Sequence, residues 1–219
     1  MNHKTHLIFD FDGVLLDSNE VKVSAFREFA SNFFSEEAAV AVVAFHKKNP
    51  GKSRFTIVDW MLDNFELNQP GFTKSQLLDN FSSTLLPSLT KASTATRLEE
   101  LAAVTGVKSS IVSAAPTNEL QYLVRNFGWG NIFYSRIMGA PVSKTRHFES
   151  LKGNFELGEA LFIGDASSDF EVARNFDVPF VFISGWSSWS PSINEQSQFH
   201  SQWTKVDDFI SHFREELAA

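Results

Sequence analysis

The chain has 219 residues, of which 43% are hydrophobic and 21% charged, a composition that is typical of a folded globular protein and excludes global disorder. Its net charge of -7 argues against nucleic acid or an anionic membrane surface as the main partner. The chain contains no cysteine, which excludes disulfides and thiolate chemistry and fits a reducing cytoplasm.

The first predicted element is a buried strand at residues 7–9. This short apolar run ends in Asp10, Asp12 and Gly13, a polar turn, so both aspartates are expected at the C-terminal end of the strand. The run is too short for a signal peptide or a membrane span. We therefore expect a cytoplasmic protein without a membrane partner.

Helical periodicity follows over residues 21–86. Apolar residues recur there at spacings of three and four, as in Val23, Phe26, Phe29, Ala30 and Phe33. Ser35 is placed to cap one helix, and Thr73 with Gln76 has the spacing of a capping box. The region predicts a bundle of about four helices.

Strands and helices alternate after Pro87. Strands are predicted at 107–112, 160–163 and 180–183, with a weaker candidate at Ile132 and Phe133. Helices are predicted at 96–105, 117–127, 143–151 and 167–175, and a surface loop at 184–202.

This alternation predicts an α/β fold, in which a mostly parallel, Rossmann-like sheet has helices on both faces. Because the helical stretch interrupts the pattern after its first strand, we expect a core domain at 1–16 and 88–219 and a helical domain at 17–87. Ligands of such sheets bind beyond the C-terminal ends of the strands. Asp10, Ser113 and Asp165 should converge there.

Four short motifs stand at these strand ends and carry a resemblance. They are DFDGV at 10–14, Ser113 after an apolar strand, Lys144 in APVSK at 140–144, and GDASSD at 164–169. Together and in this order they resemble the four motifs of the haloacid dehalogenase superfamily, over nearly the whole chain. The resemblance implies that superfamily's core fold with a small all-helical cap inserted after the first motif.

The resemblance also implies a magnesium site. It assigns Asp10 as nucleophile and metal ligand, the backbone carbonyl of Asp12 as a second ligand and Asp165 as a third. Asp169 would ligate directly, ligate through water, or orient Lys144. The chemistry agrees, because a carboxylate nucleophile and an anionic phosphate repel each other and Mg²⁺ prefers hard oxygen ligands.

Further catalytic roles follow from the same resemblance. Asp12 would protonate the leaving oxygen and then activate water, and its two-residue offset puts both carboxyls on one face of an extended segment. Ser113 would bind a phosphoryl oxygen, and Lys144 would neutralise charge. The implied activity is a phosphatase that forms an aspartyl-phosphate on Asp10.

Substrate selection is expected in the cap. Residues 46–54 form a basic turn in which Arg54, with Lys52 nearby, is our best candidate for binding a carboxylate, a second phosphate or sugar hydroxyls. A solvated loop that caps helix ends is the alternative. We expect a small phosphorylated metabolite, either a sugar phosphate or a phosphorylated acid, and a monomer or homodimer.

Other activities remain to be weighed. GVLLDS at 13–18 resembles the β-phosphoglucomutase branch, so a phosphosugar mutase is the main alternative, whereas residues 172–186 resemble phosphoglycolate phosphatases. Asp12 counts against dehalogenation and phosphonate hydrolysis, whose enzymes depart from the pattern there. A binding protein has no need for a nucleophile and a general acid together.

Overall fold

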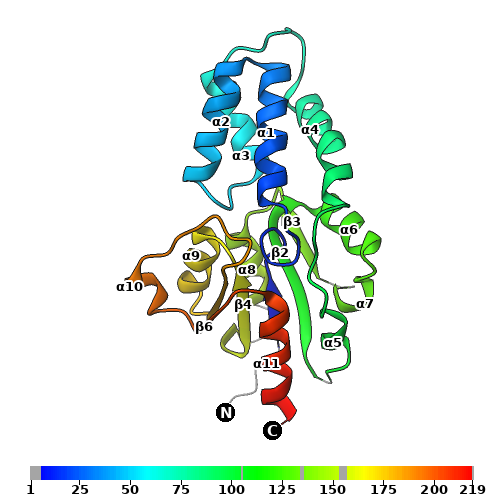
Figure 1. Ribbon diagram of the computed structural model, residues 1–219, viewed down its shortest axis with the longest axis vertical. Helices are drawn as coiled ribbons and strands as arrows, with labels where there is room; N and C mark the ends of the chain where they lie inside the picture. Colours follow the sequence, from blue (N-terminus) through cyan, green and yellow to red (C-terminus); the bar gives the residue numbers. More distant parts are fainter. Residues whose placement is uncertain (1–5, 105, 134–135, 153–156, 219) are drawn as a thin grey trace.

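The computed structural model describes residues 6–104, 106–133, 136–152 and 157–218, and a parallel sheet forms its centre (Figure 1). The strand order is β3-β2-β1-β4-β5-β6, with every neighbouring pair parallel. The strands are β1 (His6–Phe9), β2 (Lys108–Pro116), β3 (Ile137–Ala140), β4 (Ala160–Gly164), β5 (Phe180–Ile183) and β6 (Ser201–Trp203). The α/β fold with a parallel sheet is confirmed.

The register of the central strand positions the first motif. All four residues of β1 are buried, and Phe9 lies opposite Ile111 of β2 and Ile163 of β4. The next amide, that of Asp10, donates to the carbonyl of Ile163 at 2.8 Å. Asp10 therefore lies at the C-terminal end of β1, between the strands β2 and β4.

Helices cover both faces of the sheet. Alternate strand residues point to opposite faces, so Phe162 packs with Phe148 and Phe170, whereas Leu161 and Ile163 belong to the larger core on the other face. After the four helices that follow β1, the remaining helices are α5 (Glu99–Ala102), α6 (Thr117–Asn126), α7 (Gly130–Phe133), α8 (Lys144–Lys152), α9 (Ser167–Asn175), α10 (Ile193–Gln196) and α11 (Val206–Ala218). A 3₁₀ turn lies at Leu157–Glu159.

Four helices form a separate layer beyond the C-terminal ends of the strands, at the top of Figure 1. They are α1 (Asn19–Phe33), α2 (Glu36–Lys48), α3 (Arg54–Asn64) and α4 (Lys74–Leu89), here called the helical unit. The predicted Ser35 cap and the Thr73–Gln76 capping box are both present. Phe26 and Phe81 stack at 4.4 Å between ring centroids in its interior.

Two chain segments connect the helical unit to the sheet, and they lie side by side. The amide of Asp17 donates to the carbonyl of Ser93 at 2.8 Å, and the amide of Ala95 to the carbonyl of Leu15 at 2.9 Å. Leu16 and Thr94 form an antiparallel bridge between these two bonds. The helical unit is therefore attached through one short hydrogen-bonded ribbon.

Some predicted elements were wrong. Ile132 and Phe133 belong to the short helix α7, and the strand lies further on, in β3. The segment expected to be a loop contains α10 and β6. The predicted helix at 96–105 shortens to α5, and residue 105 lies outside the described residues.

Two apolar residues fit a buried helical turn as well as a strand, which explains the error at α7. The edge strands β3 and β6 have only four and three residues, which is too short for their periodicity to identify them. Within the described part of the chain, no helix combines the length and apolar character that a membrane span requires.

Candidate active site

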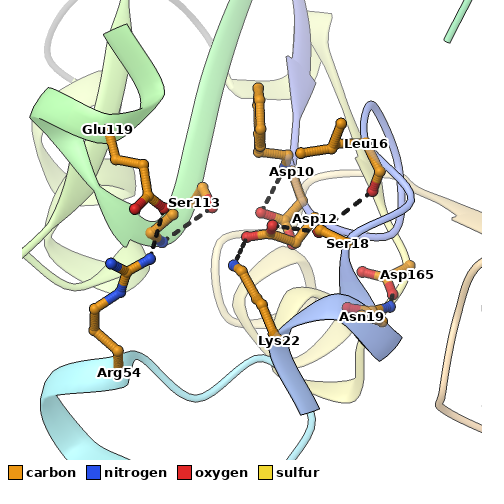
Figure 2. Close-up of polar contacts among 12 residues, drawn as sticks. Asp10, Asp12, Leu16, Ser18, Asn19, Lys22, Arg54, Ser113, Glu119 and Asp165 are labelled. Atoms are coloured by element: carbon orange, nitrogen blue, oxygen red, sulfur yellow. Dashed lines mark hydrogen bonds and ion pairs between the residues drawn. The ribbon is translucent and has the colours of Figure 1, made fainter. Parts of the chain in front are cut away.

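The motif residues gather around one cavity between the sheet and the helical unit. Asp10 follows β1, Ser113 lies in β2 and Asp165 follows β4, so the strand ends bring these side chains together as expected. The cavity has a volume of about 50 Å³. Figure 2 shows Asp10, Asp12 and Asp165 on the sheet side, facing Lys22 and Arg54 of the helical unit.

Lys144 joins two of the aspartates. It begins α8, and its Nζ lies 2.8 Å from Oδ2 of Asp10 and also forms an ion pair with Asp169. Burial of the Lys144 ammonium opposes its charge, but the carboxylates of Asp10 and Asp169 outweigh this and raise its pKa. Lys144 is 8% exposed, so it is not a solvated surface lysine.

Three buried carboxylates form a compact cluster. Oxygens of Asp10, Asp165 and Asp169 lie within 4.8 Å of one another. Burial, followed by the charge of Asp169, raises the pKa of Asp10 to about 7, and burial with the charge of Asp10 raises the pKa of Asp165 well above its usual range. Because three carboxylates share the single positive charge of Lys144, this cluster of hard oxygens fits Mg²⁺.

Asp169 has protein partners for both carboxylate oxygens. Lys144 contacts Oδ1, and the amide of Ala166 donates to Oδ2 at 3.1 Å. Asp169 is fully buried at the first turn of α9. Of the three roles left open by the sequence, this geometry favours the orientation of Lys144.

The glycine of the first motif allows a close approach. Gly13 has φ +74°, a left-handed conformation that favours glycine, and a Cβ there would lie 2.1 Å from Oδ2 of Asp165. Any side chain at this position would displace the carboxylate of Asp165. The glycine is therefore part of the geometry of the carboxylate cluster.

Asp12 is held by two residues that the sequence analysis did not single out. Ser18 Oγ donates to Oδ1 of Asp12 at 2.5 Å, and Lys22 forms an ion pair with Oδ2. Burial acts to raise the pKa of Asp12, but Lys22 and Ser18 outweigh it and hold the pKa below its usual range. Asp12 is thus stabilised as a carboxylate in this arrangement.

Asn19 was also missed. Its Nδ2 donates to Oδ2 of Asp165 at 3.1 Å and to the carbonyl of Trp186 at 2.6 Å.

Ser113, which is 1% exposed, accepts from the amide of Ala115 at 3.2 Å. In the sequence, Ser18, Asn19 and Lys22 are indistinguishable from an ordinary polar helix start, and only the position of α1 over the strand ends identifies them.

Arg54 and Lys52 line the cavity from the helical unit, but they differ in environment. Lys52 is exposed. Arg54 is buried, with Nη2 2.6 Å from Oε1 of Glu119 and Nη1 2.8 Å from Oγ of Ser82, and its guanidinium lies 5.1 Å from the Phe81 ring centroid. The guanidinium that we expected to be available to substrate is therefore engaged by protein groups.

Solved structures share this fold. CbbY from Rhodobacter sphaeroides in complex with phosphate matches with TM-score 0.70 at 12% identity, covering 94% of this chain and 96% of that one. A hydrolase from Pseudomonas syringae matches with TM-score 0.70 at 20% identity, covering 96% and 98%. A predicted phosphoglycolate phosphatase from Haemophilus somnus matches with TM-score 0.70 at 18% identity, covering 97% and 98%.

Sequence comparison gives the family. No curated protein matches the chain. A sequence model of the family described as haloacid dehalogenase-like hydrolase matches residues 7–183, which span the strands β1 to β5 and the helical unit. The chain therefore belongs to the haloacid dehalogenase-like hydrolase family, which confirms the resemblance of its motifs and the prediction of an enzyme that is a hydrolase.

Proposed function

We propose that this enzyme is a Mg²⁺-dependent phosphatase that hydrolyses a small phosphorylated metabolite through an aspartyl-phosphate on Asp10. One observation carries the proposal: the Asp10 carboxylate lies 2.8 Å from the Lys144 ammonium, inside a cavity that also holds Asp12 and Asp165. A buried nucleophile, a second carboxyl and a cation are the parts that in-line phosphoryl transfer requires.

The carboxylate cluster supports the choice of metal. Asp10, Asp165 and the backbone carbonyl of Asp12 would hold Mg²⁺, with Asp169 supporting the site through Lys144. The ion, when bound, supplies the positive charge that lets a carboxylate approach an anionic phosphate. We propose Mg²⁺ rather than a softer metal because every side-chain donor is a carboxylate oxygen.

Two displacements at phosphorus make up the proposed reaction. In the first, an Oδ of Asp10 attacks the phosphorus and the bond to the leaving oxygen breaks. Asp12, which would take up a proton when the substrate separates it from the Lys22 ammonium, donates that proton to the leaving oxygen. In the second, water attacks the aspartyl-phosphate while Asp12 accepts a proton, the Asp10–phosphorus bond breaks, and orthophosphate leaves. Asp12 and Asp10 finish as they began.

The remaining residues bind the transferring group and the substrate. Ser113 would donate its hydroxyl to a phosphoryl oxygen, and Lys144 would offset negative charge on Asp10 and on the phosphoryl group. Lys52 and Arg54 would line the side where the leaving group lies. Because Glu119 holds the Arg54 guanidinium, Arg54 would act mainly by shaping this wall.

The helical unit, residues 17–87, is proposed as a cap domain on a core of residues 1–16 and 88–219. Small phosphorylated substrates are consistent with the structural neighbours, which include a CbbY variant in complex with xylulose-(1,5)bisphosphate and predicted phosphoglycolate phosphatases. The absence of cysteine fits action in the cytoplasm. We propose that the enzyme acts as a monomer or homodimer.

The test is phosphate release from a panel of phosphorylated metabolites, with and without Mg²⁺. Asp10→Asn and Asp12→Asn should each lower the rate by about 10² or more, the Asp10 variant most, while the exposed Asp63→Asn serves as a control for loss of one charge. Absence of release from every compound, including an activated aryl phosphate, would exclude simple hydrolysis and favour the mutase alternative, assayed with a bisphosphate primer.

A further inference from the structure

Lys22 contacts the proposed acid, Asp12, from the side of the helical unit. It lies in the first turn of α1, both residues line the cavity, and their side chains are only 14% and 15% exposed (Figure 2). The Lys22 ammonium contacts Oδ2 of Asp12. Lys22 is therefore a cation of the helical unit that contacts the proposed acid directly.

Lys22 contacts Oδ2 of Asp12, the oxygen that would face a substrate. Ser18 Oγ already binds Oδ1 of Asp12 at 2.5 Å, and Ser18 is itself fully buried. Asp12 is thus oriented without Lys22, and Oδ2 is the oxygen left to face the leaving group. When a substrate takes that place, the Lys22 ammonium must exchange Oδ2 for another partner.

A largely buried ammonium does not stay unpaired, because leaving it without a counter-charge is strongly unfavourable. The other cations on this side do not compete for the same partner. Glu119 neutralises Arg54 at 2.6 Å, and Lys52 is exposed. His46, beside Phe26 at 5.4 Å, has its pKa lowered to about 4 by burial and by the charge of Lys22, so it is neutral at physiological pH.

We infer that Lys22 is a specificity residue that recognises an anionic group on the leaving half of the substrate, and that this group is a carboxylate. This inference rests on the proposed phosphatase function. A carboxylate carries one negative charge, which matches the single ammonium released from Asp12. A second phosphate carries more charge, and the guanidinium that would balance it is held by Glu119. The stacked Phe26 and Phe81 rings wall the same small cavity and suit a short carbon skeleton.

The test compares substrates that differ only at the end remote from phosphate. Three phosphate monoesters of one three-carbon chain end in a carboxylate, a hydroxyl or an ammonium group, and the matching bisphosphate is the fourth. The native enzyme should show a kcat/KM about tenfold or more higher for the carboxylate than for the hydroxyl compound. In Lys22→Met this ratio should fall close to one, and Lys22→Arg should restore most of it.

Two controls make the result specific. The exposed Lys91→Met removes the same charge away from the cavity and should leave the ratio unchanged. Binding of the same four compounds, measured by calorimetry with Mg²⁺ in Asp10→Asn and in Asp10→Asn with Lys22→Met, gives the preference without turnover and covers poor catalysis by any variant.

The outcomes separate the two proposals. Hydrolysis without a carboxylate preference, a preference that survives Lys22→Met, or a preference for the bisphosphate would overturn the role of Lys22 and leave the phosphatase standing. Failure to hydrolyse any monoester, while the carboxylate preference in binding persists and depends on Lys22, would overturn the phosphatase and keep the binding site.

Discussion

Arg54 of α3 and Glu119 of α6 form an ion pair of 2.6 Å that joins the helical unit to the sheet, with only 3% and 6% of the two side chains exposed. Oε2 of Glu119 makes no hydrogen bond to any residue that the structure describes. The pair lies beside the cavity, since Arg54 lines it. This buried ion pair therefore holds the helical unit against the rest of the fold at the edge of the cavity.

Loss of either partner of this pair should destabilise the protein. Arg54→Met or Glu119→Leu leaves a buried charge uncompensated, so each should lower the free energy of unfolding by about 3–5 kcal/mol. The double variant should regain most of the loss, because neither charge remains. Urea unfolding measures all four proteins, and strictly additive losses would contradict this account. The exposed pair Arg27–Glu36 is the control, and little or no coupling is expected there because solvent screens both charges.

Metal should act on stability through the carboxylate cluster. Mg²⁺ at about 100 times its Kd should raise the free energy of unfolding by about 2.7 kcal/mol, because it binds only the folded site. Asp165→Asn should raise stability without metal, since it removes one of the crowded buried charges, and should abolish most of the Mg²⁺ effect. Thermal unfolding with Mg²⁺ or with a chelator tests both expectations, and an Asp165→Asn protein that still responds fully to Mg²⁺ would place the ion elsewhere.

Gly51 should be needed for contact between the helical unit and the sheet. It has φ +80°, and a Cβ there would lie 2.1 Å from Oγ of Ser168 and 3.3 Å from Cβ of Ala166. Gly51→Ala should therefore make the Ser168 hydroxyl rotate away and shift the turn slightly from α9, which should lower kcat/KM by about tenfold. Gly128→Ala is the matched control, with φ +77° and open space around the added methyl, so it should cost only about 1 kcal/mol of backbone strain. Equal effects on activity would refute the steric argument.

His6 should make stability depend on pH. It is 2% exposed, its Nε2 lies 3.0 Å from Oγ of Ser110, and burial followed by the charges of Arg136 and Lys108 lowers its pKa to about 4. The unfolded chain binds the proton more readily, so this contribution is complete above about pH 6.5 and is lost as the pH falls towards 4, by an amount on the order of 3 kcal/mol. His6→Gln should flatten the dependence over that window in pH-resolved urea unfolding. The exposed His200→Gln is the control and should retain the native slope.

The features that could be predicted from the sequence are those that depend on residue type and local backbone structure. The buried runs of β1, β4 and β5, the capped helices and the motif aspartates all follow from local patterns, and the convergence of Asp10, Ser113 and Asp165 follows from parallel strands ending at one edge. These features depend on neighbours in the chain or on the sheet as a whole. They were therefore within reach of sequence reasoning.

The side-chain contacts between these residues and other elements could not be predicted from the sequence. Lys22 and Asn19 become part of the site only because α1 starts directly above the strand ends, and Glu119 matters only because α3 brings Arg54 to it. Such pairings depend on the packing of elements far apart in sequence. The short edge strands β3 and β6 were missed for a related reason, since pairing with a neighbouring strand defines them more than their own composition.

The ribbon that carries the helical unit also sets the position of Asn19 and Lys22 beside Asp165 and Asp12. Asp17 and Leu15 on one segment are bonded to Ser93 and Ala95 on the other, and α1 begins immediately beyond. A rotation about this ribbon would move Asn19 away from Asp165 and Lys22 away from Asp12 together. Opening the cavity would thus dismantle the polar contacts that α1 makes with the aspartates, and closing it would rebuild them around whatever has entered.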